Sequence, residues 1–158
     1  MCAEMAKQRG VSLIELILFI VIVSFAVAGI LLVMNNVTGR SADALVRKQT
    51  LAIAESLLEE IGLQSMSGVG CVGTLGANAA RTAATAVCDY NGYSTTAGIL
   101  DFSTNAPVPG LAGYNISPAV AVVPTAWGGI PAASAVVITV SVTGPGGRID
   151  LTGYRTAY

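Results

Sequence analysis

The sequence contains no histidine and few charged residues of either sign. Charged side chains make up 11% of the 158 residues, and the formal net charge is -1. Without histidine, Ser-His and Cys-His catalytic pairs are excluded, and no carboxylates have the spacing of a metal cage or an acid-base pair. We therefore expect a protein that is not an enzyme, with no catalytic residues, cofactor site or metal site. The lack of a basic patch argues against nucleic acid as a partner.

The C-terminal part of the chain is particularly poor in charge. Beyond residue 66 its charged side chains cancel one another: Arg81, Arg148 and Arg155 against Asp89, Asp101 and Asp150. A surface of Ser, Thr, Asn and Gly with so little charge is weakly protected against self-association. Self-association is therefore a candidate for the protein's task.

Proline is absent before Pro107, so no proline interrupts a helix in the first two thirds of the chain. The apolar segment from Val11 to Met34 would span roughly 36 Å as a helix, which is enough to cross a bilayer. After it the apolar residues narrow to a stripe typical of a helix that covers a domain. The stripe consists of Val46, Ile53, Leu57 and Ile61. We predict one helix from 11 to about 66, ended by Gly68 and Gly70.

The remainder of the chain predicts a small sheet. Strand-forming residues occur over 119–123 and alternate over 135–143 and 148–155, with a turn at 144–147 between the last two segments. The expected fold class is α+β, with a long N-terminal helix packed on a small antiparallel sheet. The predicted parts are a leader at 1–10, a membrane-spanning helix at 11–34, an amphipathic second half of that helix at 35–66, and a β domain at 67–158.

The sequence has three cysteines, Cys2, Cys71 and Cys88. Removal of a leader that contains Cys2 would leave a pair seventeen positions apart in a polar region, which favours a disulfide in an oxidising compartment. The alternative is two unrelated buried thiols.

Glu15 is the only charge inside the apolar segment, where a carboxylate is costly. If a peptidase cuts after Gly10, Val11 gains a free amino group four residues from this acid, and the amine provides a positive partner. Two alternatives stay open. Ser12 and Glu15 have the spacing of a capping box, and 26–28 resembles an ordinary signal-peptidase site of small residues.

The second half of the helix has an unusual order of charges. Its basic residues come first and its acidic residues later, so the acids oppose the helix dipole. These are Arg40, Arg47 and Lys48, then Glu55, Glu59 and Glu60. One hypothesis is that parallel, staggered copies place the basic band of one against the acidic band of another; the alternative is a plain solvated face.

Two further patterns have weak support. Residues 68–73 match the spacing of a dinucleotide-binding fingerprint, but no strand precedes them and no βαβ unit surrounds them. The aromatic residues of the C-terminal part would either line a ligand groove or, more commonly, fill a core and an interface. These aromatic residues are Tyr90, Tyr93, Tyr114, Trp127, Tyr154 and Tyr158.

The sequence 10–16, GVSLIEL, with its short basic leader and following apolar helix, resembles the type IV prepilin signature. The segments 39–43, 54–61, 88–92 and 153–158 are also similar to minor pilins of mannose-sensitive haemagglutinin (MSHA) pili. The resemblance implies that prepilin peptidase cuts between Gly10 and Val11 and methylates the Val11 amine. It also implies that Glu15 aligns an incoming subunit with the N-terminus of its neighbour.

The resemblance further implies partners and a location. The expected partners are prepilin peptidase, other major and minor pilins and an inner-membrane assembly platform. The chain would be stored in the inner membrane as a single-pass protein with a periplasmic C-terminal domain, and would then join a surface pilus. Val11 differs from the phenylalanine common in pilins, and Leu32 stands where many have proline. A type II secretion pseudopilin and a tip-located binding module are alternatives of related architecture.

Overall fold

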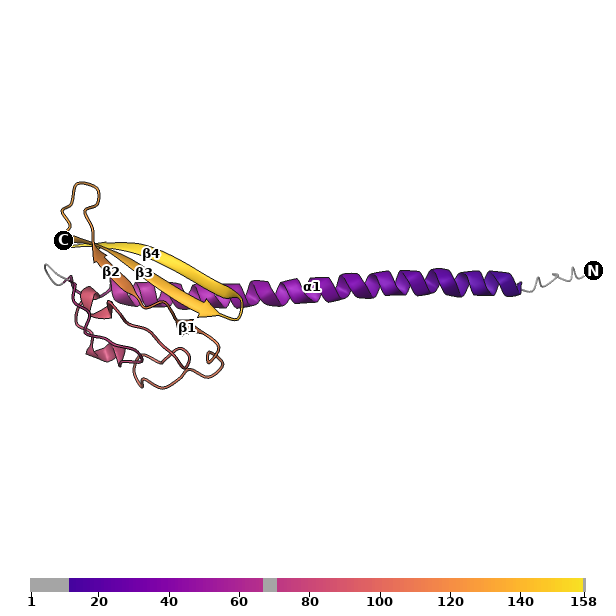
Figure 1. Ribbon diagram of the computed structural model, residues 1–158, viewed down its shortest axis with the longest axis horizontal. Helices are drawn as coiled ribbons and strands as arrows, with labels where there is room; N and C mark the ends of the chain where they lie inside the picture. Colours follow the sequence, from indigo (N-terminus) through magenta and orange to yellow (C-terminus); the bar gives the residue numbers. More distant parts are fainter. Residues whose placement is uncertain (1–11, 67–70, 158) are drawn as a thin grey trace, which may run out of the picture. The chain divides into compact units, whose positions relative to one another are not determined.

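The computed structural model describes residues 12–66 and 71–157, and the chain divides into two compact units, Met1–Ala42 and Asp43–Tyr158. The described residues form a long helix, two short 3-10 helices and an antiparallel sheet, which is the α+β class predicted from the sequence (Figure 1). The elements are α1 (Leu13–Gly62), η1 (Arg81–Ala83), η2 (Val87–Tyr90), β1 (Asn115–Ile116), β2 (Ala121–Pro124), β3 (Ala135–Gly144) and β4 (Gly147–Thr156).

Helix α1 ends earlier than the sequence predicted. Its last residue is Gly62 rather than a residue near 66, and the predicted terminators Gly68 and Gly70 lie outside the described residues. Glycine is a poor helix former, and the backbone that follows Gly62 pairs with another segment of the chain. Ser65 forms a parallel bridge with Ala86. The backbone therefore leaves the helix to pair with the segment that precedes η2.

Strand β3 is the centre of the sheet. Strand β4 pairs with its whole length, from Ala135 opposite Thr156 to Gly144 opposite Gly147, and β1 and β2 pair with two parts of its other edge. All these pairings are antiparallel. The predicted hairpin and its turn are confirmed. Strand β2 is shifted two residues from the prediction at its start, and the two-residue strand β1 was missed.

The core of the second unit lies between the sheet and the C-terminal part of α1. Alternate residues of β3 are buried as predicted: Val136, Ile138, Val140 and Val142. They share one cluster with three helix residues, Ala54, Leu57 and Ile61. Gly153 of β4 permits close approach here, because a Cβ at this position would lie 3.1 Å from both methyl carbons of Leu58. The predicted apolar stripe of α1 is thus the cover of the sheet.

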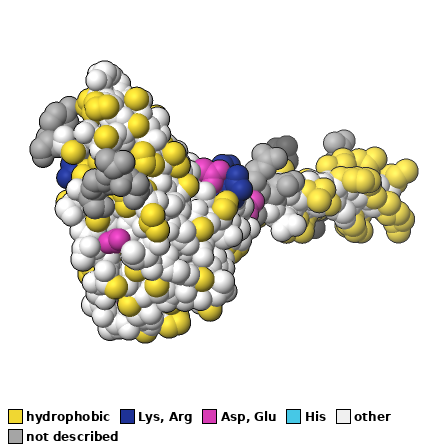
Figure 2. Space-filling model, turned by 60° about the vertical axis from the view of Figure 1, so that its left-hand side comes forward, with side chains coloured by type: hydrophobic (Ala, Val, Ile, Leu, Met, Phe, Trp, Pro, Cys, Tyr) yellow, Lys and Arg dark blue, Asp and Glu magenta, His cyan; other side chains and the backbone are white. Residues whose placement is uncertain are grey.

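The surface of the second unit carries few charges. In Figure 2 uncharged side chains and backbone dominate the visible face of this unit, with small yellow areas of hydrophobic side chains between them. This agrees with the low charge of the sequence. The hydrophobic side chains of the first unit form a much denser group in the same view.

Candidate functional site

Glu15, the predicted assembly residue, lies at the N-terminal end of α1. The helix begins at Leu13, and the amide of Leu16 donates to the carbonyl of Ser12 at 3.1 Å, so Ser12 occupies the N-cap position. Glu15 lies in the first turn and is exposed. Gly10 and Val11, the predicted cleavage and methylation positions, lie outside the described residues. The position of Glu15 fits both the capping and the assembly interpretations.

The helix that follows is apolar on all sides. The described residues contain one helix long and apolar enough to cross a membrane, Leu13–Asn35, with a mean hydropathy of 3.2 and no part of its most apolar window buried. Leu13 and Phe25 are each 76% exposed. The hydroxyl of Ser24 donates to the carbonyl of Ile20 at 2.7 Å, so this polar group is satisfied within the helix. Such a surface needs lipid or other apolar helices around it.

Cys71 and Cys88 lie at disulfide distance and are bonded, with Cα atoms 4.7 Å apart. This agrees with the pairing favoured by the sequence. Cys88 belongs to η2 and is buried, and the next residue fixes that short helix. The Asp89 carboxylate accepts from the amide of Thr85 at 2.8 Å and from that of Ala86 at 3.0 Å. These bonds, the one from Thr85 first, hold the pKa of Asp89 below its ordinary value.

A charged cluster that the sequence did not predict joins α1 to the region after it. Arg81 forms an ion pair with Glu60, and the hydroxyl of Tyr90 donates to the other Glu60 carboxylate oxygen at 2.7 Å. The second guanidinium nitrogen of Arg81 donates to the carbonyl of Leu100 at 2.6 Å, and the group lies 5.8 Å from the centre of the Phe102 ring. The side chains of Arg81 and Glu60 are only 10% and 20% exposed.

This cluster corrects the grouping of charges made from the sequence. Glu60 was placed in one acidic band with Glu55 and Glu59, but it turns toward Arg81 while Glu55 and Glu59 are exposed. A sequence signal existed. Arg81 is the one basic residue between Lys48 and Arg148, and the domain offers only two other basic partners for an acid of the helix, Arg148 and Arg155.

The cluster also changes the acidity of the buried tyrosines. Burial, followed by the hydrogen bond to Glu60, raises the pKa of Tyr90 above its ordinary value. Burial likewise raises the pKa of Tyr93, whose hydroxyl has no hydrogen-bond partner among the described residues. Both tyrosines therefore stay neutral in the core over the ordinary pH range, and Tyr90 donates its hydroxyl hydrogen bond to Glu60.

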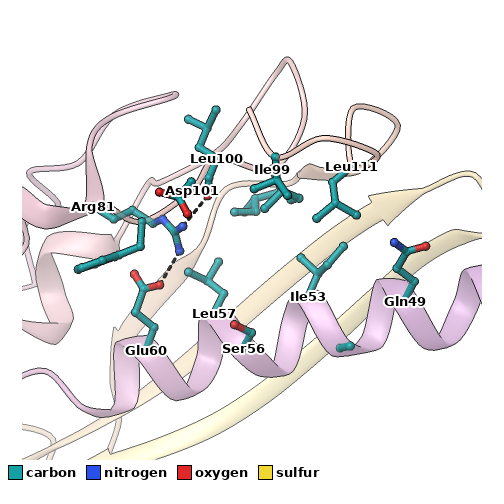
Figure 3. Close-up of a pocket in the computed structure, with 14 residues that line it drawn as sticks. Gln49, Ile53, Ser56, Leu57, Glu60, Arg81, Ile99, Leu100, Asp101 and Leu111 are labelled. Atoms are coloured by element: carbon teal, nitrogen blue, oxygen red, sulfur yellow. Dashed lines mark hydrogen bonds and ion pairs between the residues drawn. The ribbon is translucent and has the colours of Figure 1, made fainter. Parts of the chain in front are cut away.

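A groove of about 410 Å³ opens between α1 and the loop after η2 (Figure 3). Figure 3 shows Ile53 and Leu57 on the helix facing Ile99 and Leu111 of the loop, with the pair of Arg81 and Glu60 at one end. The walls are mainly apolar. At one end the two terminal guanidinium nitrogens of Arg81 are paired with Glu60 and the carbonyl of Leu100, whereas its buried Nε has no hydrogen-bond partner among the described residues. The aromatic residues named from the sequence do not line it.

Those aromatic residues separate into two groups. Tyr90, Tyr93 and Tyr114 are buried in the second unit. Trp127 and Tyr154 are about half exposed and stack on each other with ring centres 5.3 Å apart. Tyr158 lies outside the described residues. The core alternative therefore holds for Tyr90, Tyr93 and Tyr114, whereas Trp127 and Tyr154 lie at the surface.

No group of three or more Cys, Asp or Glu side chains is arranged as metal ligands would be within residues 12–66 and 71–157. Comparison with known proteins adds no family. No protein-family model matches the chain, and no curated protein or solved structure is significantly similar to it.

Proposed function

We propose that this chain is a minor type IV pilin, a structural subunit of an MSHA-type surface filament used for attachment. Prepilin peptidase removes residues 1–10 and methylates Val11, and the chain waits in the inner membrane with its C-terminal unit in the periplasm. The assembly platform then moves it into a filament with other pilins. The observation that carries the proposal is the isolated carboxylate of Glu15 in the first turn of a fully exposed apolar helix.

The charge balance of this segment supports the proposal. A carboxylate costs on the order of 3 kcal/mol at the centre of a membrane helix, and less toward its end. The ion pairs among the described residues are Arg81 with Glu60 and Arg148 with Asp150, so none of them involves Glu15. Cleavage after Gly10 would create an ammonium group on Val11, and in a filament the amine of a neighbouring subunit would occupy the same place. Because the two charges attract only when the subunits are correctly aligned, the pair selects the axial position of the incoming subunit.

The surface of the helix also suits packing against other helices. Lipid removes the usual hydrophobic drive between helices, so close contact depends on small residues. A Cβ added at Gly29 would meet no atom within 4 Å, so this position is open to a neighbour. Ala26 and Ala28 lie beside it and are exposed. In the filament, apolar side chains would exchange lipid for neighbouring helices around this small-residue segment.

The test is the substitution Glu15→Ala in cells that assemble the filament. We expect normal amounts of the variant in the membrane and at least about a tenfold loss from the filaments, which corresponds to about 1.4 kcal/mol, because the variant cannot form the aligned charge pair. Ser24→Ala is the matched control, because the hydroxyl of Ser24 is satisfied inside its own helix. Normal incorporation of the Glu15→Ala variant would refute the assigned role.

A second candidate function, binding by a tip-located subunit, is favoured by one observation. Trp127 and Tyr154 present a stacked pair of aromatic rings that is about half exposed, and the exposed Val123 lies on the same sheet face, across Val137 from Tyr154. Exposed aromatic pairs are typical of binding surfaces. A panel of immobilised glycans and surfaces, tested with the full chain and with Trp127→Ala, checks it. Equal retention of the two proteins on every ligand would exclude this surface.

A further inference from the structure

One face of the second half of α1 is uncovered by the rest of its unit. Its exposed residues recur every three or four positions and so lie on one side of the helix. This helix stripe consists of Leu45, Lys48, Ala52, Glu55, Glu59 and Leu63. Leu63 follows α1 directly and continues its bonding pattern, because its amide donates to the carbonyl of Glu59 at 3.0 Å.

The stripe has the properties of a surface that another molecule covers. The two leucines at its ends are 69% and 86% exposed, although neither belongs to the membrane-spanning segment. Its three charges are unpaired among the described residues, whose ion pairs are Arg81 with Glu60 and Arg148 with Asp150. Ala52 lies between the basic and the acidic end, where a small side chain permits close approach of a second helix.

The charges of the helix stripe are complementary to those of a second, parallel copy that is displaced along the helix axis. If a second, parallel helix is shifted by seven residues, Lys48 faces Glu55 and Leu45 faces Ala52. If it is shifted by eleven residues, Lys48 faces Glu59 and Leu63 faces Ala52. These shifts correspond to about 10 and 16 Å along the axis. At either shift a leucine meets a small residue and opposite charges meet.

The same pattern disfavours two copies at equal height. Without a shift, Lys48 would face Lys48 and each glutamate would face its own counterpart, and like charges opposite each other are destabilising. Two copies stored in one membrane stand at equal height, because the same apolar segment anchors both. Docking then requires that one copy be displaced along the axis, as happens when a subunit leaves the membrane for a filament.

We propose that a second copy of this chain docks on the helix stripe, parallel to the first and displaced so that Lys48 of one copy pairs with Glu55 or Glu59 of the other. The parallel direction rests on the proposed function, in which both copies are anchored in one membrane by the same end. The stripe is then an interface that opposes premature pairing in the membrane and favours pairing after displacement. Of the charged side chains in the bands predicted from the sequence, the proposed interface uses Lys48, Glu55 and Glu59. Glu60 takes no part, because it is paired with Arg81.

The test uses the full chain, purified in detergent as an equal mixture of ¹⁴N-labelled and ¹⁵N-labelled protein and treated with a carbodiimide. This reagent joins a lysine to a carboxylate in direct contact, and Lys48 is one of only two lysines in the sequence, with Lys7. We expect mixed-isotope peptides that join Lys48 to Glu55 or Glu59. Their absence, or joining of Lys48 to other acids of the second copy, would overturn the proposal.

Two variants control the chemistry. Lys48→Arg keeps the charge but cannot react, so it must abolish these peptides. Arg148→Lys places a reactive amine beside Asp150, its exposed partner at 3.0 Å, and must give a link within one copy only. In addition, Lys48→Glu should lower the yield of mixed-isotope peptides at least about tenfold, because like charges would then face each other. When the Lys48→Glu protein is mixed with a Glu59→Lys or Glu55→Lys protein, the carbodiimide should again join the two copies at the substituted positions. Failure of every such mixture would contradict the charge pairing.

Direction and membrane dependence are measured separately. Nitroxide labels on Gln49→Cys or Leu63→Cys, each with Cys2→Ser, give the same distance between copies if the helices are parallel. An antiparallel pair would separate the Leu63 labels by about 15 Å or more beyond the Gln49 labels, which would overturn the proposal. In lipid vesicles we expect the Lys48 link to fall at least about fivefold, because both copies stand at one height; an undiminished link there would contradict the displacement.

The two proposals fail in different experiments. Loss of the Lys48 link with Glu15-dependent filament incorporation intact would remove only the docking surface. A Glu15→Ala variant that enters filaments normally would remove the assigned role of Glu15 whatever the cross-linking shows.

Discussion

Replacing Arg81 with methionine removes the cation that balances Glu60 and keeps most of the apolar length of the side chain. The Glu60 carboxylate, with only 20% of its side chain exposed, would retain the hydrogen bond from Tyr90 but lose its ion pair, and the carbonyl of Leu100 would lose a donor. Breaking a buried pair from one side costs about 3–5 kcal/mol, and the partial exposure here places the expected loss at about 2–3 kcal/mol of unfolding free energy. The Tm of a domain of this size would fall by roughly 6–12 °C.

The assay is thermal unfolding of the full chain in detergent with the disulfide intact, followed by near-ultraviolet circular dichroism. The matched control is Arg148→Met, which breaks the exposed pair with Asp150, 54% and 44% exposed, and should cost no more than about 0.5 kcal/mol. In the double variant Glu60→Gln with Arg81→Met, the losses should be less than additive, because each substitution removes the same contact. If Arg81→Met costs no more than Arg148→Met, the role of this cluster as a tie between α1 and its domain is wrong.

Three further predictions test the second unit. Gly153→Val should cost about 1–3 kcal/mol in denaturant unfolding because its new side chain would meet Leu58. Gly62→Ala, whose added Cβ meets no atom within 4 Å, should not destabilise the protein and should add up to about 1 kcal/mol, because alanine is the better helix former. The pKa of Asp89 is lower in the folded state than its ordinary value of 3.8. The ionised carboxylate therefore stabilises the folded state fully above pH 3.8, and this stabilisation is lost as the pH falls through the folded pKa. Asp89→Asn should therefore destabilise the protein at pH 7 and progressively less below about pH 4; a pH-independent difference in Tm would contradict this. Replacing Cys71 and Cys88 with serine opens a loop of sequence separation 17 and should cost about 3 kcal/mol, and unchanged unfolding in denaturant would refute that stabilisation.

The parts of the fold with a strict hydrophobic period were predictable from the sequence. The inward valines and isoleucine of β3 alternate without exception from Val136 to Val142, and each stands on the buried face. The apolar stripe of α1 through Leu57 and Ile61 was also predicted correctly, because apolar residues that recur with a period near 3.6 over several turns share one face of a helix. The chain between the helix and β1 was not predictable in this way. It has no period, and its only regular elements among the described residues are η1 and η2.

Errors occurred where a distant contact decided the structure. Gly68 and Gly70 are the more conspicuous helix terminators, but α1 ends at Gly62 because the chain beyond it pairs with the segment around Ala86. Glu60 has the same residue type as Glu59 beside it, and only the position of Arg81 in space separates the buried acid from the exposed one. Neither contact leaves a local pattern in the sequence.

The central claim is that proteolysis after Gly10 creates the positive partner of Glu15. The intact mass of the protein extracted from the membranes of its own cells tests this claim directly. The account predicts a chain that begins at Val11 and carries one additional methyl group. A chain that begins at Met1, or one that begins at Gly29 after ordinary signal-peptide removal, would contradict it.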